Sequence, residues 1–326
     1  MSHSMWRFVA RRLFSMLLVL FAVSVLVFVI YNVIPAGDPA VRMAGKIPTE
    51  TQIEAIRKEW GFDEPLYVQY ATMMKKLFTG DTVSYFTQQN VVEEIWKGLP
   101  RTLSLAVGAA IIWMAFAIAL GTYSALRAGQ LSDRLLTVLA LVGISMPVFW
   151  LGAMLNHYLG YELGIFPNGG YVEFSEDPLQ WFWHLVLPWF CLSILFIGFY
   201  SRVLRSDILE TMGEDYVRTA RAKGLSERRV LLRHVLRNSL IPVVTLWGLD
   251  FGAVIGGSAI LTEYVFDLQG VGQYAADSIG QLDLPPIMAV TMFGAFFIVV
   301  FNTIVDIAYA ALDPRIRLED GEGAQR

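Results

Sequence analysis

The sequence lacks the features on which common enzyme and metal-binding classes depend. Its single cysteine, Cys191, can form no disulfide within the chain and no cysteine-based metal site. The four histidines are scattered, without the spacing to acidic residues that metal clusters show. No paired carboxylates and no nucleophile with a base are visible. The phosphate-binding pattern Gly-x-x-x-x-Gly-Lys-Ser/Thr is absent, so the chain is not expected to hydrolyse ATP itself.

Charged residues are also scarce. They make up 17% of the 326 residues, and 55% of the residues are apolar, whereas charged residues form about 25% of soluble domains. The composition therefore predicts an all-α membrane protein. Six apolar runs are each long enough to cross about 30 Å of hydrocarbon as a helix. They are residues 13–34, 103–126, 135–159, 181–200, 241–261 and 287–312.

The first apolar run could belong either to a signal peptide or to a membrane anchor. It follows the basic residues Arg7, Arg11 and Arg12, and Ala36-Gly37 could serve as a cleavage region. A signal peptide has an apolar region of only about 7–15 residues, whereas about 20 span a bilayer. The length therefore favours an uncleaved first span with a cytoplasmic N-terminus.

The distribution of basic residues predicts the topology. Nine Lys and Arg residues lie between Arg202 and Arg237, whereas residues 160–180 and 262–286 have none. Since cytoplasmic loops are enriched in Lys and Arg, both termini and the basic loop at 202–240 are expected in the cytoplasm. Residues 35–101 are of soluble composition, with helical patterns at 51–60 and 66–78. They predict an extracytoplasmic insert between the first span, residues 1–34, and a five-helix core, residues 102–312; a short tail, residues 313–326, follows.

The basic loop contains a predicted helix, turn and helix. The first helix begins at Asp215, a permissible N-cap, and Ala220 and Ala222 keep one side of it small enough to sit deep in another surface. Gly224 supplies the left-handed residue expected after a helix, and Ser226 can cap the second one. The loop could also act only in fixing the orientation of the chain, through its positive charge. A DNA-reading helix-turn-helix is disfavoured, because the bilayer tethers both ends of the loop.

The run Asp-Tyr-Val-Arg-Thr-Ala-Arg-Ala-Lys-Gly in this loop closely resembles the "EAA" loop of ABC importer membrane subunits, which docks into a cleft on the ATPase subunit. With residues 233–242 it resembles the dipeptide and oligopeptide permease branch. Arg218 and Arg237 stand where many members of the superfamily carry Glu and Pro, as is familiar in the peptide branch. The resemblance implies that ATPase coupling involves Asp215, Tyr216, Arg218, Thr219, Ala220, Arg221, Ala222, Lys223 and Gly224.

The resemblance covers nearly the whole chain and fits the B-type subunit of peptide permeases. Its further motifs are Ser145-Met-Pro-Val-Phe-Trp150, Phe166-Pro-Asn-Gly-Gly170, Glu263-Tyr-Val-Phe266, Gly270-Val-Gly272 and Leu312-Asp-Pro-Arg-Ile-Arg317. Relatives usually differ at Pro35-Ala-Gly-Asp-Pro39, Thr82-Val83, Gln269 and Leu282.

The resemblance implies a type I ABC importer permease with six transmembrane helices, in a bacterial cytoplasmic membrane. It also implies partners: a second homologous permease subunit, two ABC ATPase subunits that bind ATP and Mg²⁺, and an extracytoplasmic solute-binding protein. Neither a cofactor in this chain nor a nucleic-acid partner is implied. The same family serves dipeptides, oligopeptides, nickel complexes and haem, so the solute stays open.

Few polar groups fall inside the apolar runs. Asn156 and Asp250 are candidates for the translocation path, although a satisfied structural role is the plain alternative for both. Asp306 is expected to pair with a basic residue of the cytoplasmic loop, and His157 has no metal-binding partners in the sequence. An ion-coupled carrier or channel, the main alternative function, would be expected to show more buried carboxylates.

Two further patterns predict helix packing and shape. Gly248, Gly252 and Gly256 recur every four residues, which favours close approach of a neighbouring helix in lipid, either within this subunit or along a pathway or interface. Pro147 and Pro188 each free a backbone carbonyl within a predicted span, so kinks are expected there.

Overall fold

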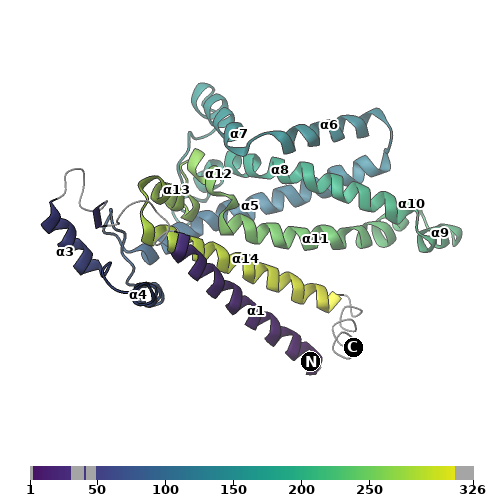
Figure 1. Cartoon of the computed structure of the whole chain (residues 1–326). Helices are drawn as coiled ribbons and strands as arrows, with labels where there is room; N and C mark the ends of the chain where they lie inside the picture. Colours follow the sequence, from purple (N-terminus) through teal and green to yellow (C-terminus); the bar gives the residue numbers. More distant parts are fainter. Residues whose placement is uncertain (1–2, 31–39, 42–48, 313–326) are drawn as a thin grey trace.

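The computed structural model describes residues 3–30, 40–41 and 49–312. Residues 31–34 of the first predicted span, the Pro35–Pro39 turn and the tail with most of its Leu312–Arg317 motif lie outside these ranges. The described residues form a series of helices, with the longest fully described connection at residues 163–177 (Figure 1). The first part of the chain contains α1 (His3–Phe28), α3 (Glu50–Trp60), α4 (Leu66–Thr79), α5 (Val91–Leu126), α6 (Leu131–Ser145), α7 (Val148–Leu155) and the π-helix η2 (Asn156–Glu162). The second part contains α8 (Pro178–Met212), α9 (Asp215–Ala222), α10 (Glu227–Val230), η3 (Leu231–Val235), α11 (Leu236–Ala253), η4 (Val254–Ser258), α12 (Ile260–Val265), α13 (Val271–Gln281) and α14 (Leu284–Leu312).

Among the described residues, five helical segments are long and apolar enough to cross a membrane, or six if one bent pair counts as a span. The five lie at Ala10–Phe28, Val91–Leu126, Pro178–Met212, Glu227–Ser258 and Leu284–Ile307. The prediction of one continuous helix over residues 135–159 is wrong, because α6 and the α7–η2 segment meet at an angle of 98°. The bend falls at Pro147, which has no N–H to continue the α6 ladder and stands at the N-cap of α7. Pro188, the other expected kink, lies inside α8, which continues through it.

The second span begins earlier than its apolar run suggests. The Asn90 side chain accepts a hydrogen bond from Glu93 N at 3.0 Å, and α5 runs from Val91 without a break to Leu126. The insert boundary expected near residue 101 therefore falls inside one helix, and α5 extends outward by about 18 Å beyond the predicted span.

The helices form an elongated bundle whose two ends carry different helices (Figure 1). The start of α1, the end of α14 and α9 lie at one end, and α3 and α4 lie at the other. In the interior, α5 packs against α8 around Trp113, whose ring stacks on Phe196 at 4.4 Å between centroids. Trp113 and Tyr200 are fully buried there.

The glycine row of the fifth predicted span lies against α14. A β-carbon at Gly248 would come within 2.4 Å of Val305 Cγ2, and one at Gly252 within 2.6 Å of Phe301 Cβ. At Gly256 it would meet the carbonyl oxygen of Gly294 at 2.8 Å. The predicted close approach is confirmed, and it is packing within the subunit.

Asp306 of α14 forms its ion pair with α1. The distance from Asp306 Oδ2 to Arg12 Nη1 is 3.0 Å. The expectation that Asp306 pairs with the cytoplasmic loop is therefore wrong, because α1 packs along α14 and places Arg12 closer. This pair ties the first span to the last one.

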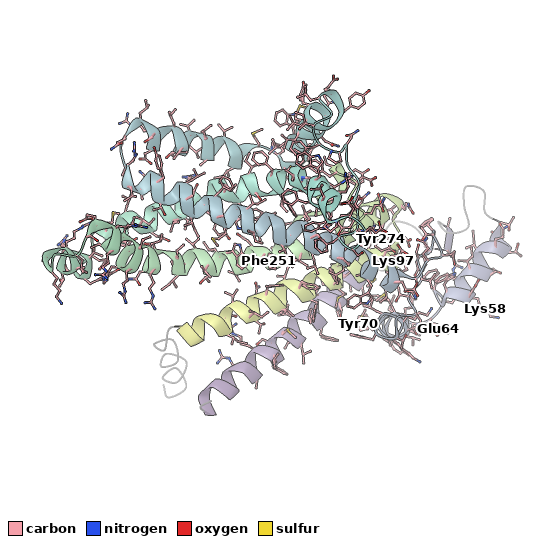
Figure 2. The ribbon with its side chains drawn as sticks, turned by 180° about the vertical axis from the view of Figure 1, so that it is seen from behind. Lys58, Glu64, Tyr70, Lys97, Phe251 and Tyr274 are labelled. Carbon is pink, nitrogen blue, oxygen red and sulfur yellow. The ribbon has the colours of Figure 1, made fainter. Side chains whose placement is uncertain are left out.

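The predicted insert is attached to the bundle through α4 and the segment after it. Tyr70 hydrogen bonds Ser24 of α1 at 2.6 Å, and its ring meets Phe28 at 5.4 Å between centroids. Figure 2 shows Tyr70 next to the bundle, with Glu64 and Lys58 farther out on the insert. The Ser84 hydroxyl donates to Asp283, which precedes α14. Both contacts hold the insert against α1 and α14.

The connection from α12 to α13, outside the spans, explains the spacing of two sequence motifs. Glu263 Oε2 accepts a hydrogen bond from Gln273 N at 3.0 Å, and a β-carbon at Gly270 would lie 2.3 Å from that oxygen. Thr102 of α5 accepts from Val271 N at 2.9 Å. Only glycine at position 270 leaves room for the carboxylate, so the two motifs form one buried contact with α5.

Glu263 should make stability depend on pH. The side chain is fully buried and Oε1 has no hydrogen-bond partner among the described residues. Burial raises the pKa of Glu263 from 4.5 to about 7. The folded chain thus holds this proton to higher pH than the unfolded chain, so the contribution is complete below pH 4.5 and is lost as pH rises through 7. A shift of this size corresponds to about 3 kcal/mol.

We expect the melting temperature of the wild type to fall between pH 5 and 8, and Glu263→Gln to flatten this slope. Glu176→Gln, at an exposed position, should keep the slope; a flat wild-type profile would contradict the assignment.

Candidate coupling helix and polar sites in the spans

The short helix α9 follows α8 after a sharp turn. Its N-cap position is occupied by Glu214, not by Asp215 as predicted, and Asp215 is the first helical residue. An acidic residue there still interacts favourably with the N-terminal end of the helix dipole. The helix ends at Ala222, and Gly224 has φ of +78°, the left-handed conformation predicted for it. Ser226 precedes α10 in the N-cap position without a side-chain capping bond.

Two opposite faces of α9 have different environments. Val217 and Ala220 are buried against the end of the bundle, where Val230 is buried as well. The expectation that Ala220 and Ala222 share one side is wrong, since residues two apart lie about 200° apart around a helix. Ala220 faces the chain's own core, and Ala222 faces outward. The other proposed coupling residues are exposed: Asp215, Tyr216, Arg218, Thr219, Arg221, Lys223 and Gly224.

Side-chain contacts tie α9 to α10 and α11. Asn238 of α11 donates to the Tyr216 hydroxyl at 2.7 Å. Arg221 pairs with Glu227 of α10, with 3.0 Å between Nε and Oε1. Together with the buried Val217, these contacts hold α9 against α10 and α11.

The outward surface of this region is basic. Arg218 contacts Asp215 at 3.3 Å, one turn away on α9. Lys223, Arg228 and Arg229 are exposed and form no ion pair with another described residue. Positive side chains without compensation favour an acidic partner surface.

A buried ion pair, which the sequence analysis missed, links the α5–α6 turn to α8. Asp133 accepts from Arg205 Nε at 2.7 Å and from Arg205 Nη2 at 2.8 Å, and also from the Ser124 hydroxyl and Gly129 N. The Asp133 side chain is only 4% exposed. The available signal was weak: an acidic residue just after a glycine turn, and an arginine just past an apolar run.

Asp250 of α11 is half-buried in the bundle. Tyr200 of α8, which is fully buried, donates its hydroxyl to Asp250 Oδ2 at 2.6 Å. This bond links α8 to α11 and gives Asp250 the structural partner that was the alternative to a place in the translocation path.

Asn156 lies at the first position of η2. It lines an open hollow of about 590 Å³ with His157, Tyr161, Asn168 and Tyr264. Its Oδ1 is buried and has no hydrogen-bond partner among the described residues. His157 stacks on Tyr161, with 6.0 Å between ring centroids. Within the described part of the chain, no hydrogen bond joins Asn156 to Asp250, so the two path candidates belong to different surroundings.

These features together define an all-helical, multi-pass transport permease of the inner membrane, with a short helix attached at one end of its spans. The family described as "Binding-protein-dependent transport system inner membrane component" matches residues 117–318, and the N-terminal model of the same kind of component matches residues 5–106. The chain belongs to this family and is the transmembrane subunit of an ATP-binding cassette importer. It is a permease subunit, not an enzyme, and acts within a complex with other subunits.

Relatives match over nearly their whole length. A probable peptide ABC transporter permease protein of Sinorhizobium fredii is 36% identical over 95% of this chain and 99% of its own. A probable D,D-dipeptide transport system permease protein of Escherichia coli K12 is 36% identical over 97% and 99%. An oligopeptide transport system permease protein of Bacillus subtilis is 37% identical over 95% and 98%.

Proposed function

We propose that this chain lines the translocation path of an importer for short peptides or a related small solute. The relatives' names support the solute class, since they refer to peptides, D,D-dipeptides and oligopeptides. The complex would also contain a second homologous permease subunit and an extracytoplasmic solute-binding protein. Two ATPase subunits would bind ATP and Mg²⁺, with both termini of this chain on their side of the membrane.

The attachment of α9 to α10 and α11 is the observation that carries the mechanism. Closure of the ATPase subunits around ATP would push α9 through its exposed residues. Because Val217 is buried in the bundle and Tyr216 is bonded to Asn238, the push would reach the spans. The spans would then exchange between inward-open and outward-open arrangements, with the population set by the contacts that each nucleotide state makes.

Uptake into vesicles distinguishes this function from an ion-coupled carrier. We expect vesicles containing only this chain to accumulate no labelled dipeptide, with or without a proton or sodium gradient. Co-reconstitution with the partner permease and ATPases, with ATP on the ATPase side and binding protein on the other, should restore uptake. Gradient-driven accumulation by the isolated chain would contradict the proposal.

A further inference from the structure

A narrow apolar groove of about 280 Å³ runs along α8 between α5 and α6. Ala140 of α6 lines one wall and Leu120 of α5 lines the other. The floor is a single face of α8, because the α8 residues that line the groove recur every three to four positions along the helix. They are Ile194, Ile197, Gly198, Ser201, Arg202 and Arg205.

The length of the groove matches one leaflet of a bilayer. From Ile194 to Arg202 the rise along α8 is about 12 Å, close to half of a hydrocarbon core, which is about 15 Å. The apolar run of α8 ends at residue 200. Arg202 therefore lies where the hydrocarbon gives way to phosphate groups, at the end of the bundle that carries α9.

The two arginines of the groove differ in their partners. Arg205 is neutralised by the bidentate bond to Asp133. Arg202 is exposed and makes no hydrogen bond or ion pair with any described residue. The mouth of the groove is therefore positive and uncompensated.

We propose that this groove binds an anionic phospholipid, with one acyl chain on α8 and the phosphate at Arg202. A guanidinium is well suited to a phosphate, and basic pockets between transmembrane helices recognise lipid head groups in this way. A free phosphate would leave the apolar floor exposed. A transmembrane helix of a partner would cover about 30 Å, twice the length of the groove.

Lipid retention tests the proposal. The full chain is incorporated into nanodiscs of equal parts phosphatidylcholine and phosphatidylglycerol, re-extracted in mild detergent, and its bound lipids are measured by mass spectrometry. We expect the wild type to retain phosphatidylglycerol preferentially and Arg202→Gln to lower that preference about fivefold. Arg134→Gln is the matched control, because Arg134 is an exposed arginine in the first turn of α6 outside the groove.

A second variant tests whether the acyl chain lies in the apolar part of the groove. Ala140→Leu fills the groove while leaving Arg202 intact, and we expect it to reduce retention of both lipids. Equal phosphatidylglycerol retention by the wild type and Arg202→Gln would overturn the proposal. So would a disulfide between Ala140→Cys and a cysteine on a partner permease helix, because a partner would then occupy the groove.

Discussion

Replacement of Gly224 by Val should reduce uptake at least about tenfold while the protein still inserts into the membrane. Gly224 has φ of +78° and no atom within 4 Å of an added β-carbon, so the effect arises from the backbone and not from a clash. The left-handed conformation costs a residue with a side chain on the order of 1–2 kcal/mol, and a β-branched one more. The turn between α9 and α10 would therefore open, and the exposed face of α9 would lose its position. Uptake and ATPase stimulation are measured in the reconstituted complex.

Gly80 offers a matched control for this experiment. It has φ of +81°, also with open space around an added β-carbon, but it follows α4 in the outer insert. Gly80→Val carries the same backbone strain away from α9. Full uptake in Gly224→Val, or equal losses in both variants, would contradict a specific role of the turn after α9.

Removal of the Asp133 carboxylate should cause the largest loss of stability. Asp133→Asn leaves the charge of Arg205, whose side chain is 29% exposed, without its bidentate partner, and the expected loss is about 1–3 kcal/mol, below the cost for a fully buried pair. We expect a lower melting temperature by tryptophan fluorescence in detergent, and weaker coupling of ATP hydrolysis to uptake, because the α5–α6 turn is no longer fixed to α8.

The exposed pair on α9 is the control for the buried one. Asp215→Asn removes a carboxylate that is 95% exposed, so its melting temperature should stay close to that of the wild type. The double variant Asp133→Leu with Arg205→Met should recover part of the stability, because it leaves no uncompensated charge. If Asp133→Asn and Asp215→Asn have the same melting temperature, the pair has no structural importance.

Much of the fold could be predicted because it follows from local patterns. Apolar runs gave most of the spans, and the spacing of Gly248, Gly252 and Gly256 gave the α11–α14 contact. Shape was harder to predict. Pro147 and Pro188 look alike in sequence, yet a bend of 98° occurs at the first while α8 continues through the second. Met146, before Pro147, is extended with φ of −81° and ψ of 129°, whereas the residues around Pro188 stay helical, and the local sequence did not distinguish the two cases.

Long-range polar contacts were the least predictable part of the candidate sites. Asp133 and Arg205 are 72 residues apart, and Arg12 and Asp306 come from the two ends of the chain. Ala220 illustrates a second limit, since its small size is compatible with docking or with burial. The start of α5 depends on capping by Asn90, and the end of α9 depends on the turn at Gly224. Only the turn was evident in the sequence.

Crosslinking from α9 tests the central claim most directly. Ala222 is small and exposed, and the native Cys191 is buried, so Ala222→Cys introduces one accessible thiol on α9. Lys58→Cys on α3 places a thiol at the opposite end (Figure 2). With the complex in inverted vesicles and a short bifunctional reagent, we predict that Ala222→Cys joins this chain to an ATPase subunit, with a yield that changes on adding ATP, and that Lys58→Cys does not. Labelling of Ala222→Cys only from the outer side of the membrane, or no ATPase adduct in any nucleotide state, would contradict the account.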